Sequence, residues 1–200
     1  LNAGPRHRFC TANFVAHNCL GLGYGLGPSK FMSIFKQWTG GEISARQAED
    51  MVRDFRNSNQ LLTQFWRRME RLAKGSVGGN MEVELPSGRT IIYRDVCMRE
   101  GDVVGRPVAG EAPRKLWSGA IVENLTQGTA REILVDGLLK MQKAGLRVVL
   151  HVHDEVVVEV KEDQVQDAKR QLEEIMSTAP DWMPGLPLAC EAKIADRYGK

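Results

Sequence analysis

Two acidic residues, Asp154 and Glu155, lie between two runs of mostly β-branched residues in segment 148–160, VVLHVHDEVVVEV. Such runs are typical of short β-strands, and almost no residues remain between them for a loop. The segment therefore predicts a tight hairpin with both carboxylates at its tip, pointing to opposite faces because side chains alternate along a strand. Paired acids on a rigid turn can bind a hard divalent cation, since Mg2+ prefers carboxylate oxygens together with substrate phosphates.

An ordinary solvated turn is the alternative interpretation of these two acids, because turns favour Asp. His153 directly precedes the acids, and the strands around them are apolar. Both observations favour a functional site over a plain turn. His151 lies two residues before His153 on the same strand face and is left without a role.

A second motif, Gly21-Leu22-Gly23-Tyr24-Gly25, forms a glycine-dense turn that leads to Lys30. Glycine lets a backbone approach a nucleotide or a template base closely, and Tyr24 offers a flat face and a hydroxyl. Glycine-rich turns before helices are common, so this motif alone does not define a function.

The third motif is the segment 123–131, ENLTQGTAR, inside a long helical pattern. Polar amides within a helix are costly unless they find partners, although exposed polar residues explain the segment equally well. The small residues from Gly128 to Ala130 indicate close packing against another element.

The composition bounds the class of protein. The chain has 200 residues, of which 42% are hydrophobic and 26% charged, as in ordinary soluble globular proteins. Because the net charge is only +2, nucleic-acid binding would depend on local patches. No apolar stretch approaches membrane-spanning length, so no membrane partner is expected.

The chain starts at Leu1, which suggests a fragment or a processed product. The cysteines lack metal-type or disulfide-type spacing, which favours a reducing, intracellular setting; they are Cys10, Cys19, Cys97 and Cys190.

The periodicity predicts an α+β fold, with a layer of antiparallel strands backed by helices. Ser44 and Gln47 form a capping box that would open one helix. Helices are expected from Pro28, from the capping box to about Arg56, and over about 59–74. A hairpin at 81–97 and a long helix over about 116–144 would follow. The acidic hairpin, a helix over about 162–176 and a last strand near 188–194 would complete the chain.

Together, the three motifs resemble family A DNA polymerases, the group of bacterial DNA polymerase I and many phage replicative enzymes. His153-Asp154-Glu155 is similar to the last catalytic motif of that family, at the hairpin of the palm. LGLGYG followed by Lys30-Phe31 is similar to the end of the fingers helix that holds the incoming nucleotide. Gln127 matches the palm glutamine near the primer–template minor groove, and GRTIIY at 88–93 resembles phage-type enzymes. The resemblance covers residues 19–200.

The resemblance implies a polymerase palm with an antiparallel sheet backed by helices, plus part of the fingers. Residues 19–80 would be partial fingers helices, and residues 81–200 the palm subdomain. The implied activity is template-directed, Mg2+-dependent addition of dNTPs to a primer on primer–template DNA, in the cytoplasm of a bacterial or phage-infected cell. Two Mg2+ ions would clamp the attacking and leaving oxygens.

The resemblance also assigns roles to single residues. Asp154 would be a direct ligand of Mg2+, Glu155 would support the primer end or the groups around the metal, and His153 would contact the primer backbone. In the nucleotide and template site, Leu20 would face the sugar, Tyr24 would lie under the template–nucleotide pair, Gly25 would keep the backbone close, and Gln127 would reach the minor groove.

One departure from the family lies near the N-terminus. The family expects a lysine eight residues before the fingers tyrosine and an arginine four residues earlier, both of which neutralise nucleotide phosphates. Ala16 and Ala12 occupy these positions. Phosphoryl transfer depends on charge stabilisation, so two alanines conflict with a working polymerase.

Residues 1–18 resemble the C-terminal end of an intein, a short β-type tail, which removes the conflict. His17 is its penultimate histidine, Asn18 its terminal residue and Cys19 the nucleophile that follows, while His7 matches an assisting histidine in an upstream block. Cys19 would accept the upstream acyl chain, and Asn18 would cleave by cyclising, with acid assistance from His17 and His7. The expected partner is an upstream polymerase and intein half, which would also supply the missing lysine and the second metal aspartate.

Two other interpretations remain open. The chain could be only a splicing substrate with a decayed polymerase part, or a nucleic-acid-binding fragment without polymerase activity of its own. The intact Asp154, Glu155, Tyr24 and Gln127 argue against decay.

Overall fold

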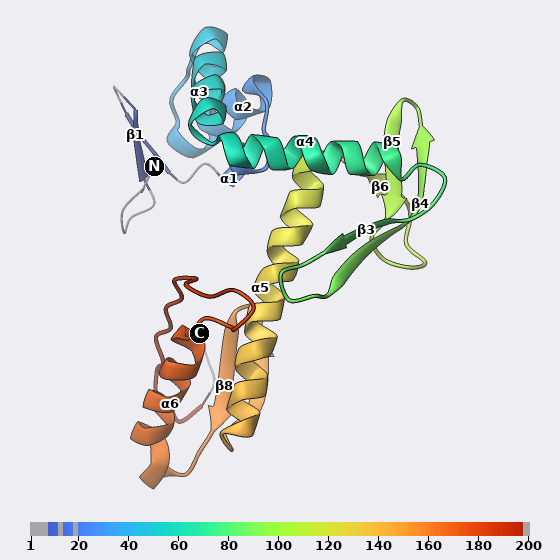
Figure 1. The fold of residues 1–200 in the computed structure, drawn as a ribbon. Helices are drawn as coiled ribbons and strands as arrows, with labels where there is room; N and C mark the ends of the chain where they lie inside the picture. The colour runs from blue at the N-terminus through green and yellow to red at the C-terminus, as the bar shows by residue number, and fades with distance from the viewer. Residues whose placement is uncertain (1–7, 12–13, 18–19, 198–200) are drawn as a thin grey trace. The chain divides into compact units, whose positions relative to one another are not determined.

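The chain forms two compact units in the computed structural model, which describes residues 8–11, 14–17 and 20–197. Unit 1 comprises residues 1–82 and 92–124, and unit 2 comprises residues 83–91 and 125–200. Helix α5 (Ser118–Lys143) contributes its first turns to unit 1 and the rest to unit 2 (Figure 1). No helix of the described part is long and apolar enough to cross a membrane.

From Pro28 onward, the helices of unit 1 begin near the residues that the sequence predicts. Pro28 takes the first position of its helix, where its missing N–H costs nothing. The Ser44 hydroxyl accepts a hydrogen bond from the Gln47 N–H at 3.3 Å, which confirms the capping box. Leu22, Phe31, Ala48 and Val52 are buried in one core between these helices. The helices are α1 (Leu20–Gly23), α2 (Pro28–Thr39), α3 (Ala45–Ser58) and α4 (Gln60–Gly75).

The hairpin predicted at 81–97 is confirmed, but it belongs to a larger antiparallel sheet with the order β3-β4-β5-β6. Strand β5 was missed because it holds only two adjacent apolar residues before Gly105. A Cβ at Gly105 would lie 2.7 Å from Leu116 Cδ1, so glycine lets this side chain pack close to the strand. The strands are β3 (Met81–Glu84), β4 (Thr90–Arg99), β5 (Asp102–Arg106) and β6 (Arg114–Lys115).

A separate pair of strands, β1 (Arg8–Thr11) and β2 (Phe14–His17), lies in the segment with intein resemblance. The two strands are antiparallel, with Arg8 opposite His17. The expectation of a short β-type tail therefore has a backbone counterpart, although the side chains of these strands lie outside the described structure.

Unit 2 packs a hairpin of β7 (Arg147–Val152) and β8 (Glu155–Glu159) against two helices (Figure 1). Its core joins Met141 of α5 to Leu172 of α6 (Val165–Ser177), which follows the 3-10 turn η1 (Glu162–Gln164). Alternate valines of β8 pack on this core, because one face of the strand is covered.

The last strand predicted near 188–194 is wrong, since residues 178–197 form neither helix nor strand. This segment is held by a side chain instead of a strand partner. The Ala192 N–H donates to Glu173 Oε1 at 3.0 Å, and Cys190 and Ala192 pack on the core of unit 2. The apolar alternation that suggested a strand therefore reflects packing against α6.

Candidate active site

The acidic hairpin is confirmed as a tight two-strand turn in unit 2. Val152 lies opposite Glu155, so only His153 and Asp154 connect the strands. The register shifts between Val148 and Leu150, which is a β-bulge. Bulges increase the local twist and redirect side chains near functional sites.

The turn holds His153 in a backbone conformation that histidine rarely adopts. Its φ is 52°, in the left-handed region. A two-residue hairpin needs a positive φ at its first central residue, where glycine or asparagine is usual. A residue with a Cβ costs about 1–2 kcal/mol there. Such an outlier on a well-paired hairpin indicates a position kept for its side chain.

The polar side chains of the tip face solvent. His153, Asp154 and Glu155 are all exposed, and so is His151 on β7. Exposure leaves the carboxylate of Asp154 accessible to a hydrated cation. Among the described residues, no group of three or more His, Cys, Asp or Glu side chains is arranged to hold a metal ion. The tip supplies two carboxylates, which is part of a ligand set for Mg2+ and not a closed cage.

Helix α5 runs beside this hairpin, and its middle lies level with the tip. From Arg147 to His153 the strand covers about 20 Å. Going back along α5 from Lys143, about 18 Å leads to Arg131 and about 24 Å to Gln127. Figure 1 shows the start of β8 beside the middle of α5. Gln127 is exposed at that level of the helix.

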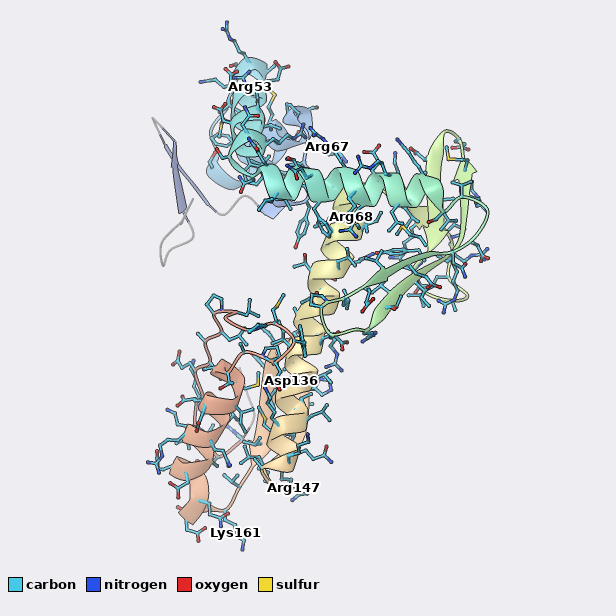
Figure 2. The ribbon with its side chains drawn as sticks, viewed as in Figure 1. Arg53, Arg67, Arg68, Asp136, Arg147 and Lys161 are labelled. Atoms are coloured by element: carbon cyan, nitrogen blue, oxygen red, sulfur yellow. The ribbon has the colours of Figure 1, made fainter. Side chains whose placement is uncertain are left out.

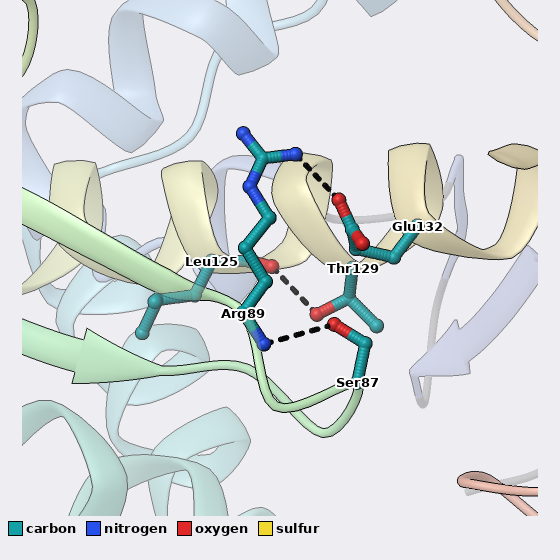
Figure 3. A network of polar contacts seen from close by, with 5 residues as sticks. All are labelled: Ser87, Arg89, Leu125, Thr129 and Glu132. Atoms are coloured by element: carbon teal, nitrogen blue, oxygen red, sulfur yellow. Dashed lines mark hydrogen bonds and ion pairs between the residues drawn. The ribbon is translucent and has the colours of Figure 1, made fainter.

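The turn between β3 and β4 packs on α5 next to Gln127. A Cβ at Gly128 would lie 2.9 Å from Ile91 Cδ1 and 3.2 Å from Leu85 Cδ1, so glycine permits the close approach. This confirms the close packing expected at Gly128, whereas Ala130 of the same small-residue segment is exposed. Arg89 and Glu132 form an ion pair at 2.5 Å across the contact, and the Thr129 hydroxyl donates to the Leu125 carbonyl at 2.8 Å (Figure 3).

In unit 1, the tyrosine turn follows one short helix and rests on the start of α5. The sequence suggested a turn from Gly21, but residues 20–23 are helical and the turn begins at Tyr24. The Gly25 N–H donates to the Leu22 carbonyl at 3.0 Å, and Gly25 has a φ of 82°. A Cβ at Gly119 would overlap the Tyr24 carbonyl, so this glycine lets α5 approach the turn.

Tyr93 and Asn124 form a polar contact in unit 1 that the sequence reasoning missed. Tyr93 is fully buried on β4, and its hydroxyl oxygen accepts a hydrogen bond from Asn124 Nδ2 at 3.1 Å. Burial raises the pKa of Tyr93, and the Asn124 hydrogen bond partly lowers it. Asn124 lies one helical turn before Gln127 on α5. A buried tyrosine within the GRTIIY segment was the available signal.

The predicted site residues fall into three groups. His153, Asp154, Glu155 and Gln127 belong to unit 2. Leu20, Tyr24 and Gly25 belong to unit 1, and the side chain of Leu20 lies outside the described structure. Among the splicing residues, His17 lies on β2 without a described side chain, and His7, Asn18 and Cys19 lie outside the described residues.

Comparison with known sequences defines the class of protein. The sequence model of the family described as DNA polymerase family A matches residues 17–200, which is nearly the whole chain. The chain belongs to this family.

The individual relatives are polymerases of phage and bacterial origin. The DNA polymerase of Bacillus phage SP02 is 28% identical over 207 aligned positions, covering 90% of this chain and 31% of the phage protein. DNA polymerase I of Pseudomonas aeruginosa strain PAO1 is 33% identical over 122 positions, covering 58% of this chain and 12% of that protein. The chain therefore spans about a third or less of the curated relatives it matches.

A solved structure shares the fold. The POL domain of Pol1 from M. smegmatis, in complex with DNA primer-template and dNTP, matches with a TM-score of 0.55 and 22% sequence identity. The match covers 84% of this chain and 27% of that chain. It confirms the predicted α+β class, with antiparallel sheets and helices arranged as in a polymerase domain.

Proposed function

We propose that the chain is the C-terminal part of a DNA-directed DNA polymerase that extends a primer under the direction of a template. The observation that carries this proposal is the family match over residues 17–200, combined with an exposed acid pair on a turn strained at His153. Phage and bacterial relatives support action in the cytoplasm of a bacterial or phage-infected cell. Primer–template DNA and dNTPs are the proposed partners, because the solved neighbour forms a complex with both.

The acid pair suits the metal that such chemistry needs. Mg2+ binds through one or two carboxylates plus substrate phosphates, and the exposed carboxylate of Asp154 offers one such ligand. Asp154 would hold the ion, with further oxygens from the nucleotide and from the rest of the polymerase. When bound, Mg2+ stabilises the charge that develops on the transferring phosphoryl group.

The neighbouring residues position the primer in this proposal. Glu155 orients the primer end through its hydrogen-bonding oxygens. His153 donates to the primer backbone, which explains why a side chain is kept at a positive φ. Gln127, level with the tip on α5, reaches the minor groove, where hydrogen-bond acceptors are nearly independent of sequence.

The tyrosine turn serves the template and nucleotide. Tyr24 lies under the template–nucleotide pair as a flat stacking surface. Gly25 keeps the backbone close to it, as its φ of 82° requires a glycine. Leu20 faces the sugar of the incoming nucleotide.

Primer extension by the full polymerase tests this proposal. Asp154→Ala is expected to lower the extension rate by about a thousandfold or more, because charge stabilisation of the transferring phosphate is lost. Asp163→Ala, an exposed acid on η1 of the same unit, is the matched control and should leave the rate unchanged. Duplex binding without any extension by the unaltered polymerase would favour the nucleic-acid-binding alternative instead.

We further propose that residues 1–18 are an intein end removed by splicing. Two observations support this: the family match begins at residue 17, and Ala12 and Ala16 stand where the family has phosphate-neutralising cations. The Cys19 thiolate would take the upstream acyl group as a thioester. The Asn18 amide nitrogen would attack its own carbonyl, breaking the Asn18–Cys19 bond and leaving a succinimide, with His17 and His7 assisting.

Mass spectrometry of the precursor combined with its upstream half tests the splicing step. The unaltered pair is expected to give a ligated product in which the upstream polymerase half is joined directly to Cys19. Asn18→Ala should stop release of residues 1–18, while Asp154→Ala should leave ligation intact. Ligation by the Asn18→Ala variant at the normal rate would contradict the proposal.

A further inference from the structure

Helix α5 of unit 2 has one covered face and one exposed face. Leu125 and Gly128 are turned toward the β3–β4 turn, and Glu132 on the same side is only 15% exposed and pairs with Arg89. The opposite side of these two turns is exposed in the described part of the chain. The residues of this exposed strip are Thr126, Gln127, Ala130 and Arg131.

Arg131 brings to this strip a positive charge that pairs with no carboxylate among the described residues. Arg89, Arg147 and Arg170 of the same unit each form an ion pair with a carboxylate. Arg131 forms none within the described part of the chain, and the neighbouring Glu132 is already paired with Arg89. Because an arginine stays protonated at any working pH, the strip presents a full positive charge.

The spacing of the strip matches a DNA groove. Gln127 and Arg131 are four residues apart on one face of α5, about 6 Å along the axis. The minor groove is about 6 Å wide. If the Gln127 amide contacts the base edges, Arg131 lies at the border of the groove, where the phosphates are. Ala130 between them is small and leaves room for the duplex.

The strip also lies level with the acidic tip. By the rise of strand and helix, the tip falls between the levels of Gln127 and Arg131 along α5. A duplex whose primer end reaches Asp154 would therefore pass this part of the helix. An arginine there can bind a phosphate through two parallel hydrogen bonds from its planar guanidinium group. The single ammonium group of a lysine cannot form this bidentate arrangement.

We propose that Arg131 binds a backbone phosphate of the primer–template duplex beside the minor groove that Gln127 contacts. This inference rests on the proposed function, because its ligand is the primer–template DNA. Arg131 is a binding residue for the duplex in this account and takes no part in the chemical step.

The test measures duplex affinity of the full polymerase against salt concentration, without dNTP. Arg131→Gln is expected to weaken binding about fivefold, whatever the DNA sequence, and to lower the slope of log K against log salt by about 0.9. Arg131→Lys should keep the slope and lose part of the affinity. Arg170→Gln on α6, with a side chain 76% exposed, is the matched control and should behave as the unaltered polymerase. In extension assays, Arg131→Gln should raise KM for the duplex and leave kcat within twofold.

The outcomes separate this inference from the proposed function. If the unaltered polymerase binds and extends the primer while Arg131→Gln keeps the full salt slope, the phosphate contact is overturned and the polymerase function stands. If the unaltered polymerase neither binds nor extends a primer–template, the proposed function fails, and this inference fails with it.

Discussion

Unit 2 contains two short turns between antiparallel strands, and they differ in how they meet the same backbone requirement. The turn after β3 places Gly88 at a φ of 84°, and the turn after β7 places His153 at 52°. The first is anchored, since the Leu85 N–H donates to the Arg89 carbonyl at 2.7 Å and the turn packs on α5. The second faces solvent and carries Asp154.

Under the proposed function, the difference separates a structural turn from a functional one. Glycine reaches a positive φ without a steric cost, so the Gly88 turn is relaxed. Histidine does not, so the His153 turn gives up stability to keep an imidazole beside two acids. A position that breaks the local rule without a packing gain is where function is expected.

The largest effect in this comparison is expected at His153. His153→Gly should raise the local stability of the β7–β8 hairpin by about 0.5 kcal/mol, because the left-handed strain is relieved while glycine gains freedom in the unfolded state. Extension should nevertheless fall about tenfold, the loss of one hydrogen bond to a charged group. Amide hydrogen exchange on β8 measures the first effect, and single-turnover extension measures the second. A more stable hairpin with unchanged extension would make the tip a purely structural turn.

The reverse change at the structural turn should cost stability alone. A Cβ at Gly88 would meet no atom within 4 Å, so Gly88→Ala tests backbone strain without a clash. Its expected cost is about 1 kcal/mol of local stability. Exchange of the Leu85 amide, which is bonded within this turn, reports the change. Extension at a permissive temperature should match the unaltered polymerase, and a loss of extension equal to that of His153→Gly would erase the distinction.

Tyr93, on the strand that leaves the structural turn, gives a prediction with a pH dependence. Burial raises the pKa of Tyr93 in the folded state above the ordinary value of 10.0. The contribution of Tyr93 to folding stability is therefore present below pH 10 and is lost as pH rises through the folded pKa. Tyr93→Phe should cost about 1 kcal/mol at pH 8, because Asn124 loses its partner. The variant should also lose less stability than the unaltered protein above pH 10. Urea unfolding at pH 8 and above pH 10 compares the two; parallel pH profiles would contradict the buried tyrosine.

The smallest effect is expected at the ion pair that closes the structural turn. Arg89 is 62% exposed, so its pair with Glu132 is screened by solvent. Arg89→Gln should cost at most about 0.5 kcal/mol. Arg147→Gln, which breaks the exposed pair with Glu159 at the far end of the acidic hairpin (Figure 2), is the matched control and should cost the same. If hydrogen exchange shows a markedly larger loss of local stability in Arg89→Gln than in Arg147→Gln, the turn depends on its ion pair more than on the packing at Gly128.

The sequence predicted the elements that local rules determine. Pro28, the Ser44–Gln47 capping box and the valine runs around Asp154 each fix a start or a turn by short-range chemistry. Strand β5 could not be predicted, because its identity depends on pairing with β4 and on Leu116 filling the space above Gly105. The false strand at 188–194 has the same origin, since its alternating apolar residues pack on α6 without a strand partner.

The residue types of the candidate site could be predicted from the sequence, but the neighbours that the fold brings to them could not. The acids at 154 and 155 and the amide at 127 were visible as motifs. That Gln127 lies level with the tip follows only from the short connection after α5, which turns β7 back along the helix. The partnership of Tyr93 with Asn124 joins residues 31 positions apart, which no local pattern encodes.

Metal-directed cleavage tests most directly whether the β7–β8 tip is the metal-binding centre of nucleotidyl transfer. Fe2+ would replace Mg2+ in the full polymerase bound to primer–template and a dNTP on a primer without a 3′ hydroxyl, and peroxide would generate radicals at the ion. Mass spectrometry should locate backbone cuts at or next to His153–Glu155, and Asp154→Ala should remove them. Cuts that fall elsewhere and persist in Asp154→Ala would contradict the account.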